Sequence, residues 1–593
     1  MSYRAGRPAA FLAMVMLALP AAAEETPAKA QGIYEAAYFA PFAPQTAYDI
    51  ATRTPGFALV VGDEVRGFAG ASGNVLIDGA RPSSKSGGVE DVLRRIPASQ
   101  VERVEVIRDA QTSEAQGQSV VLNIVRRRGV DGGAWSAELE RNGSGLLYPR
   151  GQVSYARKLG GWDASVKANG FWEQFPYRTL RLIRDGSGRL TSSFVDDRPT
   201  TLTEAFLSGD ASRSAGDGVL KVTARFGWQK FYYDLHSDIF LARTPAGRPD
   251  QDNLFDFERE IWNAELGGDY VREIGPWTWK VVGLATLEPY QQDQTDTRSA
   301  ADGRTLSQST VRLRQLPLEA LARTTFVRAA KGRFKPEFGV ETAYNRLDSE
   351  LSLVVDSGSG PRAIALPAAD VLVQEWRGEA FANLTWEVSR RLTLEGALAL
   401  EASRTTVTGD ARNNQSFAFL KPGGAVVFRM TPRTQARVGL RRSVGQLNFS
   451  DFAASAELQD DETVAGNPAL RPDRTTRLSA SVDHRVEGGF AISIEGYREW
   501  RKDVLEQVLL PSGAPGLGNA GSATVTGIKG SLNAPLDRIL PGANLKVDAE
   551  FRRSRFADPL IGAARELNDL RSPTVTAEFR HNLVRAPWRG FDI

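Results

Sequence analysis

The sequence predicts a transmembrane antiparallel β-barrel that follows a small α/β domain. From residue 131 onward, apolar and polar residues alternate in segments of about ten residues, the length and pattern of a tilted strand that crosses lipid. After residue 23, no apolar run reaches the ~18 residues that a membrane helix needs. The N-terminus has the pattern of a secretory signal peptide, which directs the mature chain out of the cytoplasm.

The signal peptide is predicted at residues 1–23. Arg4 and Arg7 supply its positive charge, and the apolar stretch 10–19 follows. This stretch is too short to serve as a membrane anchor. The small side chains of Ala21–Ala23 match the cleavage rule, so we expect cleavage directly after this tripeptide.

Two segments with different patterns precede the barrel. Residues 24–45 are rich in Ala, Pro and Glu without regular apolar spacing, which predicts a mobile periplasmic leader. Residues 46–130 mix helical and strand patterns and are long enough for a modest core. Helices are expected at 46–53 and at 89–95, the second with an apolar face and a stop at Pro97, and strands at 75–77, 101–107 and 120–125.

The barrel is predicted at residues 131–593. In 391–401, for example, Leu398 and Leu400 fall on one face, whereas Glu395 and Glu401 fall on the other. A soluble β-sandwich also alternates, but its strands average only ~5–6 residues. Because closure removes strand edges, a barrel crosses lipid without helices. Four polar stretches are assigned to extracellular loops: 234–259, 291–309, 356–369 and 446–474.

Composition excludes several kinds of site. The formal net charge is only +2, which gives no electrostatic case for nucleic-acid binding, and we interpret the run Arg126–Arg128 as a solvated charge cluster at a domain junction. The chain has no cysteine, so disulfides and thiolate metal sites are impossible. His236, His484 and His581 lack metal-ligand spacing, and no nucleophile motif lies beside them. We therefore expect no metal, no cofactor and no catalysis.

Two motifs in the α/β domain resemble the plug domain of TonB-dependent outer-membrane receptors. The first begins with a short strand and turn, and the second matches the family pattern I-P-x-x-x-I-E-R-I-E-V. The resemblance covers residues 46–128 and departs from the family at Asp109 and Ala110, where Gly-Pro is usual. The plug-motif residues are Asn74, Val75, Leu76, Ile77, Asp78, Gly79, Arg81, Pro82, Ile96, Pro97, Glu102, Arg103, Glu105 and Asn123.

A third motif resembles a G-N-P-x-L-x-P signature found late in the barrels of this family, at the return from an extracellular loop. Its residues are Gly466, Asn467, Pro468, Leu470 and Pro472. The resemblance implies a plug inside the lumen of a 22-stranded barrel, whereas counting alternating segments gives roughly eighteen or nineteen strands. Because Ile593 stands where an aromatic residue is usual, we expect the barrel to be truncated at its C-terminus.

The resemblance implies a receptor in the outer membrane of a Gram-negative bacterium that takes up a scarce, bulky extracellular small molecule. TonB would bind the leader and remodel the plug, although Ile33–Glu35 is a poor match to the expected TonB-binding segment. A ferric siderophore is the first expectation for the ligand, with oligosaccharide and cobalamin as alternatives. A ligand-binding barrel without active transport also remains open, and a monomer is expected. Phe171, Trp172, Phe449 and Phe452 are candidate stacking residues, although packing roles are favoured.

Overall fold

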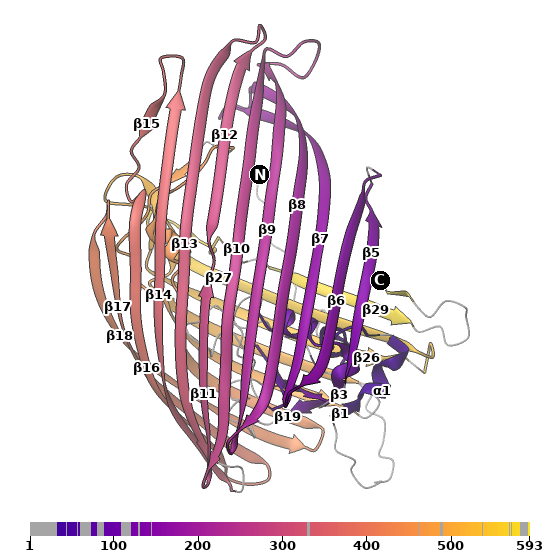
Figure 1. Ribbon diagram of the computed structural model, residues 1–593. Helices are drawn as coiled ribbons and strands as arrows, with labels where there is room; N and C mark the ends of the chain where they lie inside the picture. Colours follow the sequence, from indigo (N-terminus) through magenta and orange to yellow (C-terminus); the bar gives the residue numbers. More distant parts are fainter. Residues whose placement is uncertain are drawn as a thin grey trace, which may run out of the picture.

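The computed structural model shows a closed antiparallel barrel and a small sheet domain at one end of it (Figure 1). It describes residues 32–42, 44–55, 57, 59, 73–79, 88–107, 120–127, 131–143, 145–328, 332–459, 462–486, 490–536, 538–568, 570, 572–581 and 591–592. Among these residues, no helix is long and apolar enough to cross a membrane. The predicted signal peptide lies outside the described residues.

The small domain is built on a four-stranded sheet in the order β1-β3-β4-β2. β2 runs parallel to β4, and the other neighbours are antiparallel. The helix expected at 89–95 is confirmed as α4, and its apolar face buries Val89 and Leu93. The elements are β1 (Ile33–Glu35), α1 (Ala36–Phe39), η1 (Ala40–Phe42), α2 (Ala47–Thr52), β2 (Val75–Ile77), α4 (Gly88–Arg95), η2 (Ala98–Gln100), β3 (Val101–Ile107) and β4 (Val121–Arg126).

Local sequence explains these elements. Thr46 caps α2 through a reciprocal pair of hydrogen bonds with Asp49, which satisfies backbone N–H groups at the start of the helix. In β3, Val101 and Val104 are wholly buried because they face α1 and α2, whereas Glu102 is exposed. β4 is central in the sheet and therefore apolar on both faces over most of its length.

The assignment of residues 24–45 to a mobile leader is wrong for its second part. Ile33–Glu35 pairs with β3 as an edge strand, and the Val106 N–H donates to the Gly32 carbonyl. Phe39 is completely buried in the core of the small domain. The domain therefore starts by residue 33 rather than 46. An edge strand of three residues has too weak a sequence pattern to be separated from the leader.

The barrel strands pair with their neighbours in chain order, with three exceptions. β11 and β12 together fill one place between β10 and β13. β14 pairs directly with β16, and β27 with β29, because β15 and β28 are short strands at their ends. Their bounds are β5 Gly132–Arg141, β6 Leu147–Leu159, β7 Trp162–Arg184, β8 Leu190–Ala215, β9 Gly218–Leu241, β10 Gln251–Ile274, β11 Trp277–Leu287, β12 Tyr290–Ala300, β13 Thr305–Arg328, β14 Phe334–Asp356, β15 Arg362–Ile364, β16 Asp370–Glu387, β17 Leu392–Gly409, β18 Asn413–Thr431, β19 Thr434–Val444, β22 Arg474–Arg485, β23 Ala491–Lys502, β26 Ser522–Pro535, β27 Ala543–Ala557, β28 Ala564–Arg565, β29 Thr574–His581 and β30 Phe591–Asp592.

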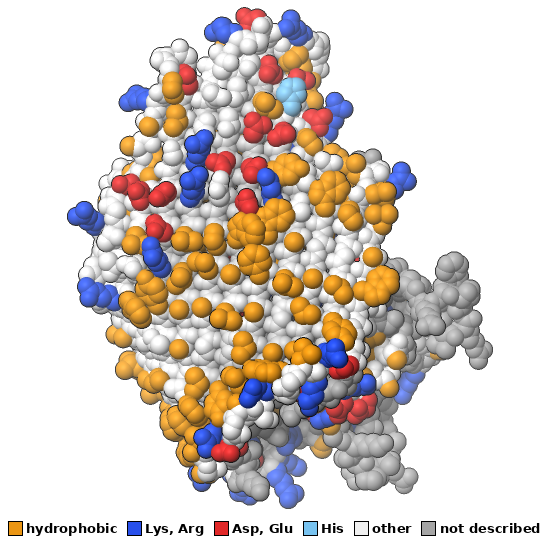
Figure 2. Space-filling model, viewed as in Figure 1, with side chains coloured by type: hydrophobic (Ala, Val, Ile, Leu, Met, Phe, Trp, Pro, Cys, Tyr) orange, Lys and Arg blue, Asp and Glu red, His pale blue; other side chains and the backbone are white. Residues whose placement is uncertain are grey.

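Alternation along each strand separates a lipid face from a lumen face. In β17, Leu398 and Leu400 are 51% and 58% exposed, whereas Glu395 and Glu401 are buried in the lumen wall. Figure 2 shows the resulting apolar band between two charged zones. Trp228 and Trp262 both donate their indole N–H to Glu260, at 2.8 and 2.9 Å. Indoles with an apolar body and a polar tip are typical of the membrane interface.

Two of the polar stretches assigned to loops are strand instead. Residues 234–241 belong to β9 and 251–259 to β10, and most of 291–309 lies in β12 and β13. β8, β9 and β10 contain 26, 24 and 24 residues, far more than the ~9–11 needed to cross lipid. Beyond the membrane the outward positions of these strands are polar and the apolar residues lie on the inward face, as buried Leu235 and Phe255 do, so the ladder continues where the lipid-facing pattern has ended.

Candidate functional site

The first plug motif fixes the edge of the small sheet. The Asn74 side chain donates to the Val120 carbonyl, and the Asn74 carbonyl accepts from Leu122. Val75, Leu76 and Ile77 form the buried strand β2. Asp78 and Gly79 then turn the chain with positive φ values of 54° and 81°, a conformation that Gly and Asp tolerate best. Arg81 and Pro82 lie outside the described residues.

The second motif forms one hydrogen-bond network with the first. Arg103 pairs with Glu102 and Glu105 at 2.5 and 2.9 Å. The other oxygen of Glu105 accepts from Asn123, whose own side-chain oxygen accepts from the Gly79 N–H at 2.8 Å. The motif carboxylates and amide therefore hold β3, β4 and the turn after β2 together.

Ile96 and Pro97 have a separate structural role. Ile96 is buried, its carbonyl accepts from Ala47 at the start of α2, and Pro97 forms a bridge with Thr46. These contacts join the end of α4 to the start of α2. Within the described residues, the plug motifs thus build the small domain itself.

Arg126 joins the small domain to the barrel. Its Nε donates to Asp78 at 2.8 Å, and its Nη1 lies 3.5 Å from Oδ2 of Asp210 in β8. The other oxygen of Asp210, Oδ1, accepts from the Ser165 hydroxyl in β7. The Arg126 side chain is 19% exposed. The interpretation of this residue as part of a solvated cluster is therefore wrong. Burial alone would lower the pKa of Arg126, but the two carboxylates raise it above its ordinary value.

A second contact joins the same two bodies. Lys167 of β7 is buried, and its ammonium donates to the Arg94 carbonyl at the end of α4 at 2.9 Å. The Arg94 guanidinium lies 3.6 Å from the centre of the Tyr48 ring. With the Arg126 pairs, this contact seats the small domain against the inner face of β7 and β8. Polar contacts therefore hold the described part of the small domain against the barrel wall, as is typical of interfaces between domains that move relative to one another.

The Gly466 signature anchors a segment that folds into the lumen. We call this segment, residues 445–473 between β19 and β22, the inserted loop; it contains η4 (Phe449–Phe452), β20 (Ser455–Glu457) and β21 (Glu462–Val464). A Cβ at Gly466 would lie 2.3 Å from the Phe452 carbonyl oxygen, so only glycine fits there.

The other signature residues are held by hydrogen bonds and burial. The Asn467 side chain donates to Leu517 in β25 (Pro515–Asn519), which pairs with β24 (Leu505–Leu509). The Pro468 carbonyl accepts from Asn413 and Gln415, in the part of β18 that extends past β19. Leu470 is completely buried, and Pro472 precedes β22. The signature therefore sets the base of the inserted loop.

The inserted loop covers part of the lumen wall. Phe452 packs against Val371, Val373 and Val407, which face inward from β16 and β17. Farther along, Gln294 of β12 donates to the Ala456 carbonyl at 3.1 Å and accepts from the Leu458 N–H at 2.9 Å. Phe449 packs beside Phe452, so these two stacking candidates fill the loop rather than line an open cavity.

An aromatic surface faces the lumen near the inserted loop, and the sequence analysis did not identify it. Phe231 and Tyr233 of β9 lie beside Phe255 and Phe257 of β10, and we call these four residues the aromatic wall. The alternation along β9 predicts it, because every second residue faces inward and beyond Trp228 these residues include Phe231 and Tyr233. Phe255 and Phe257 lie in the stretch 234–259 that the sequence analysis predicts as a loop, and Phe231 and Tyr233 directly precede it.

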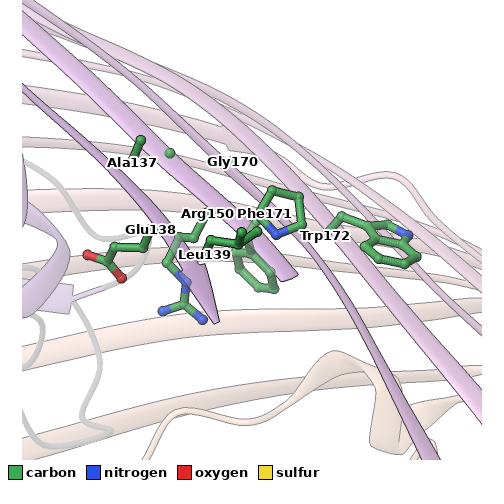
Figure 3. A pocket seen from close by; sticks show the side chains of 9 residues that line it. Ala137, Glu138, Leu139, Arg150, Gly170, Phe171 and Trp172 are labelled. Carbon is green, nitrogen blue, oxygen red and sulfur yellow. The ribbon is translucent and has the colours of Figure 1, made fainter. Parts of the chain in front are cut away.

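The other two stacking candidates lie elsewhere on the barrel. A hollow of ≈ 610 Å³ is lined mainly by β5, β6 and β7 residues, including Phe171 and Trp172 (Figure 3). Arg150 lies over the Phe171 ring, 5.0 Å from its centre, and these two side chains extend to the same side of the strands. Trp172 is 37% exposed and points away from them. Strand parity places Trp172 on the lipid face.

No metal-ligand cluster occurs among the residues that the structure describes. His484 lies 2.9 Å from the Thr434 hydroxyl, across the pair β19–β22. His236 and His581 lie on other strands, β9 and β29. The structure thus brings none of the three histidines together.

Comparison with known proteins agrees with this architecture. The chain matches the family described as TonB dependent receptor-like, beta-barrel over residues 207–588, and the TonB-dependent receptor plug domain over residues 35–120. No curated protein sequence gives a significant match.

Solved structures share the fold at low identity. A mutant of the ferric enterobactin receptor from Pseudomonas aeruginosa is 15% identical, with a TM-score of 0.54 over 94% of this chain and 84% of that one. The ferric yersiniabactin uptake receptor from Yersinia pestis is 12% identical, with a TM-score of 0.53 over 93% and 82%. A copper transporter is 16% identical, with a TM-score of 0.51 over 92% and 83%. With its plug and barrel both matched, the chain belongs to the TonB-dependent receptor family of Gram-negative outer-membrane β-barrels.

Proposed function

We propose that this protein takes up a scarce, bulky ligand across the outer membrane, with a ferric siderophore as the ligand to test first. The observation that carries the proposal is the polar seating of the plug. Arg126 with Asp210, and Lys167 with the Arg94 carbonyl, connect the plug to β7 and β8. Contacts of this kind hold a stopper in place yet allow force to move it, which a gated lumen requires.

TonB is the proposed source of that force, and it would bind a segment near the N-terminus as an added strand. Ile33–Glu35 pairs with β3 on one side and forms the edge of the plug sheet on the other, where an added strand would pair. We therefore propose that TonB contacts residues 24–31 or β1. The proposed protein is a monomer without catalytic activity or a cofactor, and the inserted loop lies on its extracellular side.

The test is uptake by a deletion strain that carries the gene on a plasmid. Under iron starvation, the complemented strain should outgrow the deletion strain on a supplied ferric siderophore, and removal of TonB should abolish the difference. Deletion of residues 24–31 should have the effect of TonB loss, whereas deletion of the exposed turn 186–188 should not. Equal growth of all strains on siderophores, glycans and cobalamin would refute transport.

Passive ligand binding is the alternative function, and the same strains separate the two. A passive receptor would bind ligand at the cell surface with or without TonB. Accumulation of the ligand inside the cell would then be the same in both strains, whereas active transport requires TonB for accumulation. Oligosaccharide or cobalamin uptake would appear as TonB-dependent growth on those compounds with no response to iron. Turnover of a substrate by the purified protein would contradict the absence of catalysis.

A further inference from the structure

The aromatic wall is unusual for its position. Lower on the same face of β9, inward residues are polar, as Lys221, Arg225 and Gln229 are. Higher up, the rings of Tyr233 and Phe257 stack 5.0 Å apart at 9°, and Phe231 meets Phe257 edge-on at 5.8 Å. A contiguous aromatic surface inside a polar lumen marks a place where something binds.

The loop tip, which we define as residues 455–459, occupies this surface. Leu458 packs against the aromatic wall, and Gln459 accepts a hydrogen bond of 2.7 Å from the Tyr233 hydroxyl. Gln294 holds the backbone of Ala456 and Leu458 from the adjacent β12. The tip is held by these hydrogen bonds and by the packing of Leu458 and Ala456, whereas a close steric fit fixes Gly466 at the base of the loop. The tip can therefore separate from the wall while the base stays in place.

Two arginines give the wall a positive character. Arg198 lies 4.9 Å from the ring centres of both Tyr177 and Tyr233, and Arg259 lies 5.1 Å from that of Phe231. The Nε of each guanidinium is buried without a hydrogen-bond partner in the described part of the chain. A buried N–H that lacks an acceptor indicates a missing partner.

The loop tip also carries a negative charge to this surface. Glu457 is the last residue of β20 and directly precedes Leu458 in the tip. The carboxylate of Asp196 on β8 is already engaged by Arg181 and Ser237. The tip therefore presents an apolar side chain, a carboxylate and a hydrogen-bonding amide to an aromatic, cationic wall.

We propose that the aromatic wall with Arg198 and Arg259 is a ligand subsite and that the loop tip is its built-in competitor. The ligand is a flat aromatic compound with negative charge, because rings stack on the wall and anions satisfy the two guanidinium groups. The inference rests on the proposed function and specifies its ligand class. Ligand binding displaces the tip, which opens the lumen above the plug.

Binding to the purified full chain in detergent tests this competition, with the ferric complex of 2,3-dihydroxybenzoate as an anionic aromatic probe. The double variant Leu458→Ala/Gln459→Ala loosens the tip and should bind the probe about tenfold more tightly, because less binding energy goes into displacement. Arg198→Gln/Arg259→Gln should bind about tenfold more weakly. The control is Leu560→Ala. Leu560 is 47% exposed and lies in another loop, so this variant should bind the probe like the unmodified protein. Heat-dependent gel migration confirms that each variant is folded.

A cross-link tests displacement directly. The chain contains no cysteine, so Val311→Cys/Ala456→Cys introduces the sole pair, at two positions that pack together. Joining them with a short, reducible thiol cross-linker should weaken probe binding at least tenfold, and reduction should restore it. Equal affinity before and after cross-linking overturns the proposal, as does weaker binding by the tip variant or no saturable binding to any form.

The outcomes also separate this inference from the proposed function. TonB-dependent uptake by cells together with probe binding that ignores the cross-link would refute the competing tip and leave transport intact. Cross-link-sensitive binding without TonB-dependent uptake would refute transport and support the subsite.

Discussion

Replacement of Arg126 by Met should loosen the plug. The guanidinium lies 3.5 Å from Asp210 and 2.8 Å from Asp78. At an effective dielectric constant of about 20, one such pair is worth roughly 4 kcal/mol before desolvation is subtracted. Because the side chain is 19% exposed and burial has its own cost, we expect a net loss of about 1–2 kcal/mol. The backbone hydrogen bond from Arg126 to Asp78 survives the substitution.

Hydrogen exchange of the β4 amides, measured on the intact protein in detergent, reports the opening of the plug at this contact. A loss of ~1.4 kcal/mol corresponds to tenfold faster exchange. The control is Arg127→Met, which removes the same charge from an exposed neighbour and should leave the rate unchanged. Equal exchange in the two variants would refute the role assigned to Arg126.

Three further predictions concern the inserted loop and the plug. Gly466→Ala places a methyl group 2.3 Å from the Phe452 carbonyl and should destabilise the loop by about 1–3 kcal/mol, seen as faster proteolysis, whereas Gly496→Ala meets no atom within 4 Å and should not. Burial raises the pKa of Asp451 from 3.8 to about 6, so the folded loop binds this proton more tightly than the unfolded loop does. The loop should therefore gain protection from hydrogen exchange as pH falls from about 7 to about 5, and Asp451→Asn should remove that pH dependence. Asn123→Ala should cost roughly 1–3 kcal/mol in plug unfolding by urea, because it leaves polar partners unsatisfied; an unchanged midpoint would contradict this.

The sequence predicted the architecture because each part has a local signature. Alternation with a period of two identifies a strand and its two faces, so the exposed Leu398 and the buried Glu401 were assigned correctly. The helix that ends before Pro97 follows from the spacing of Val89 and Leu93. The plug motifs identified the family through their order along the chain.

The limits of strands and the roles of charged residues were harder to predict. Above the membrane the apolar residues of β9 and β10 face inward and the outward positions are polar, as in Leu235 beside Asp234, so this part of the ladder resembled a polar loop. Edge strand β1 is too short to show a period. Arg126 resembled a solvated residue because its partner Asp210 is 84 positions away.

The sequence by itself determined that this chain forms a lipid-facing barrel with an α/β plug. The spacing of apolar residues along the chain decides whether a segment is a strand or a helix and which of its faces is apolar, and that spacing is a local property. Only the tertiary structure decided which loop also folds into the lumen and which residues it contacts there. Gln294 meets Leu458 across 164 positions of sequence, and this contact places the loop tip beside the aromatic wall. Contacts of such separation depend on how the sheet closes and where a loop returns. No short-range pattern encodes either of these properties.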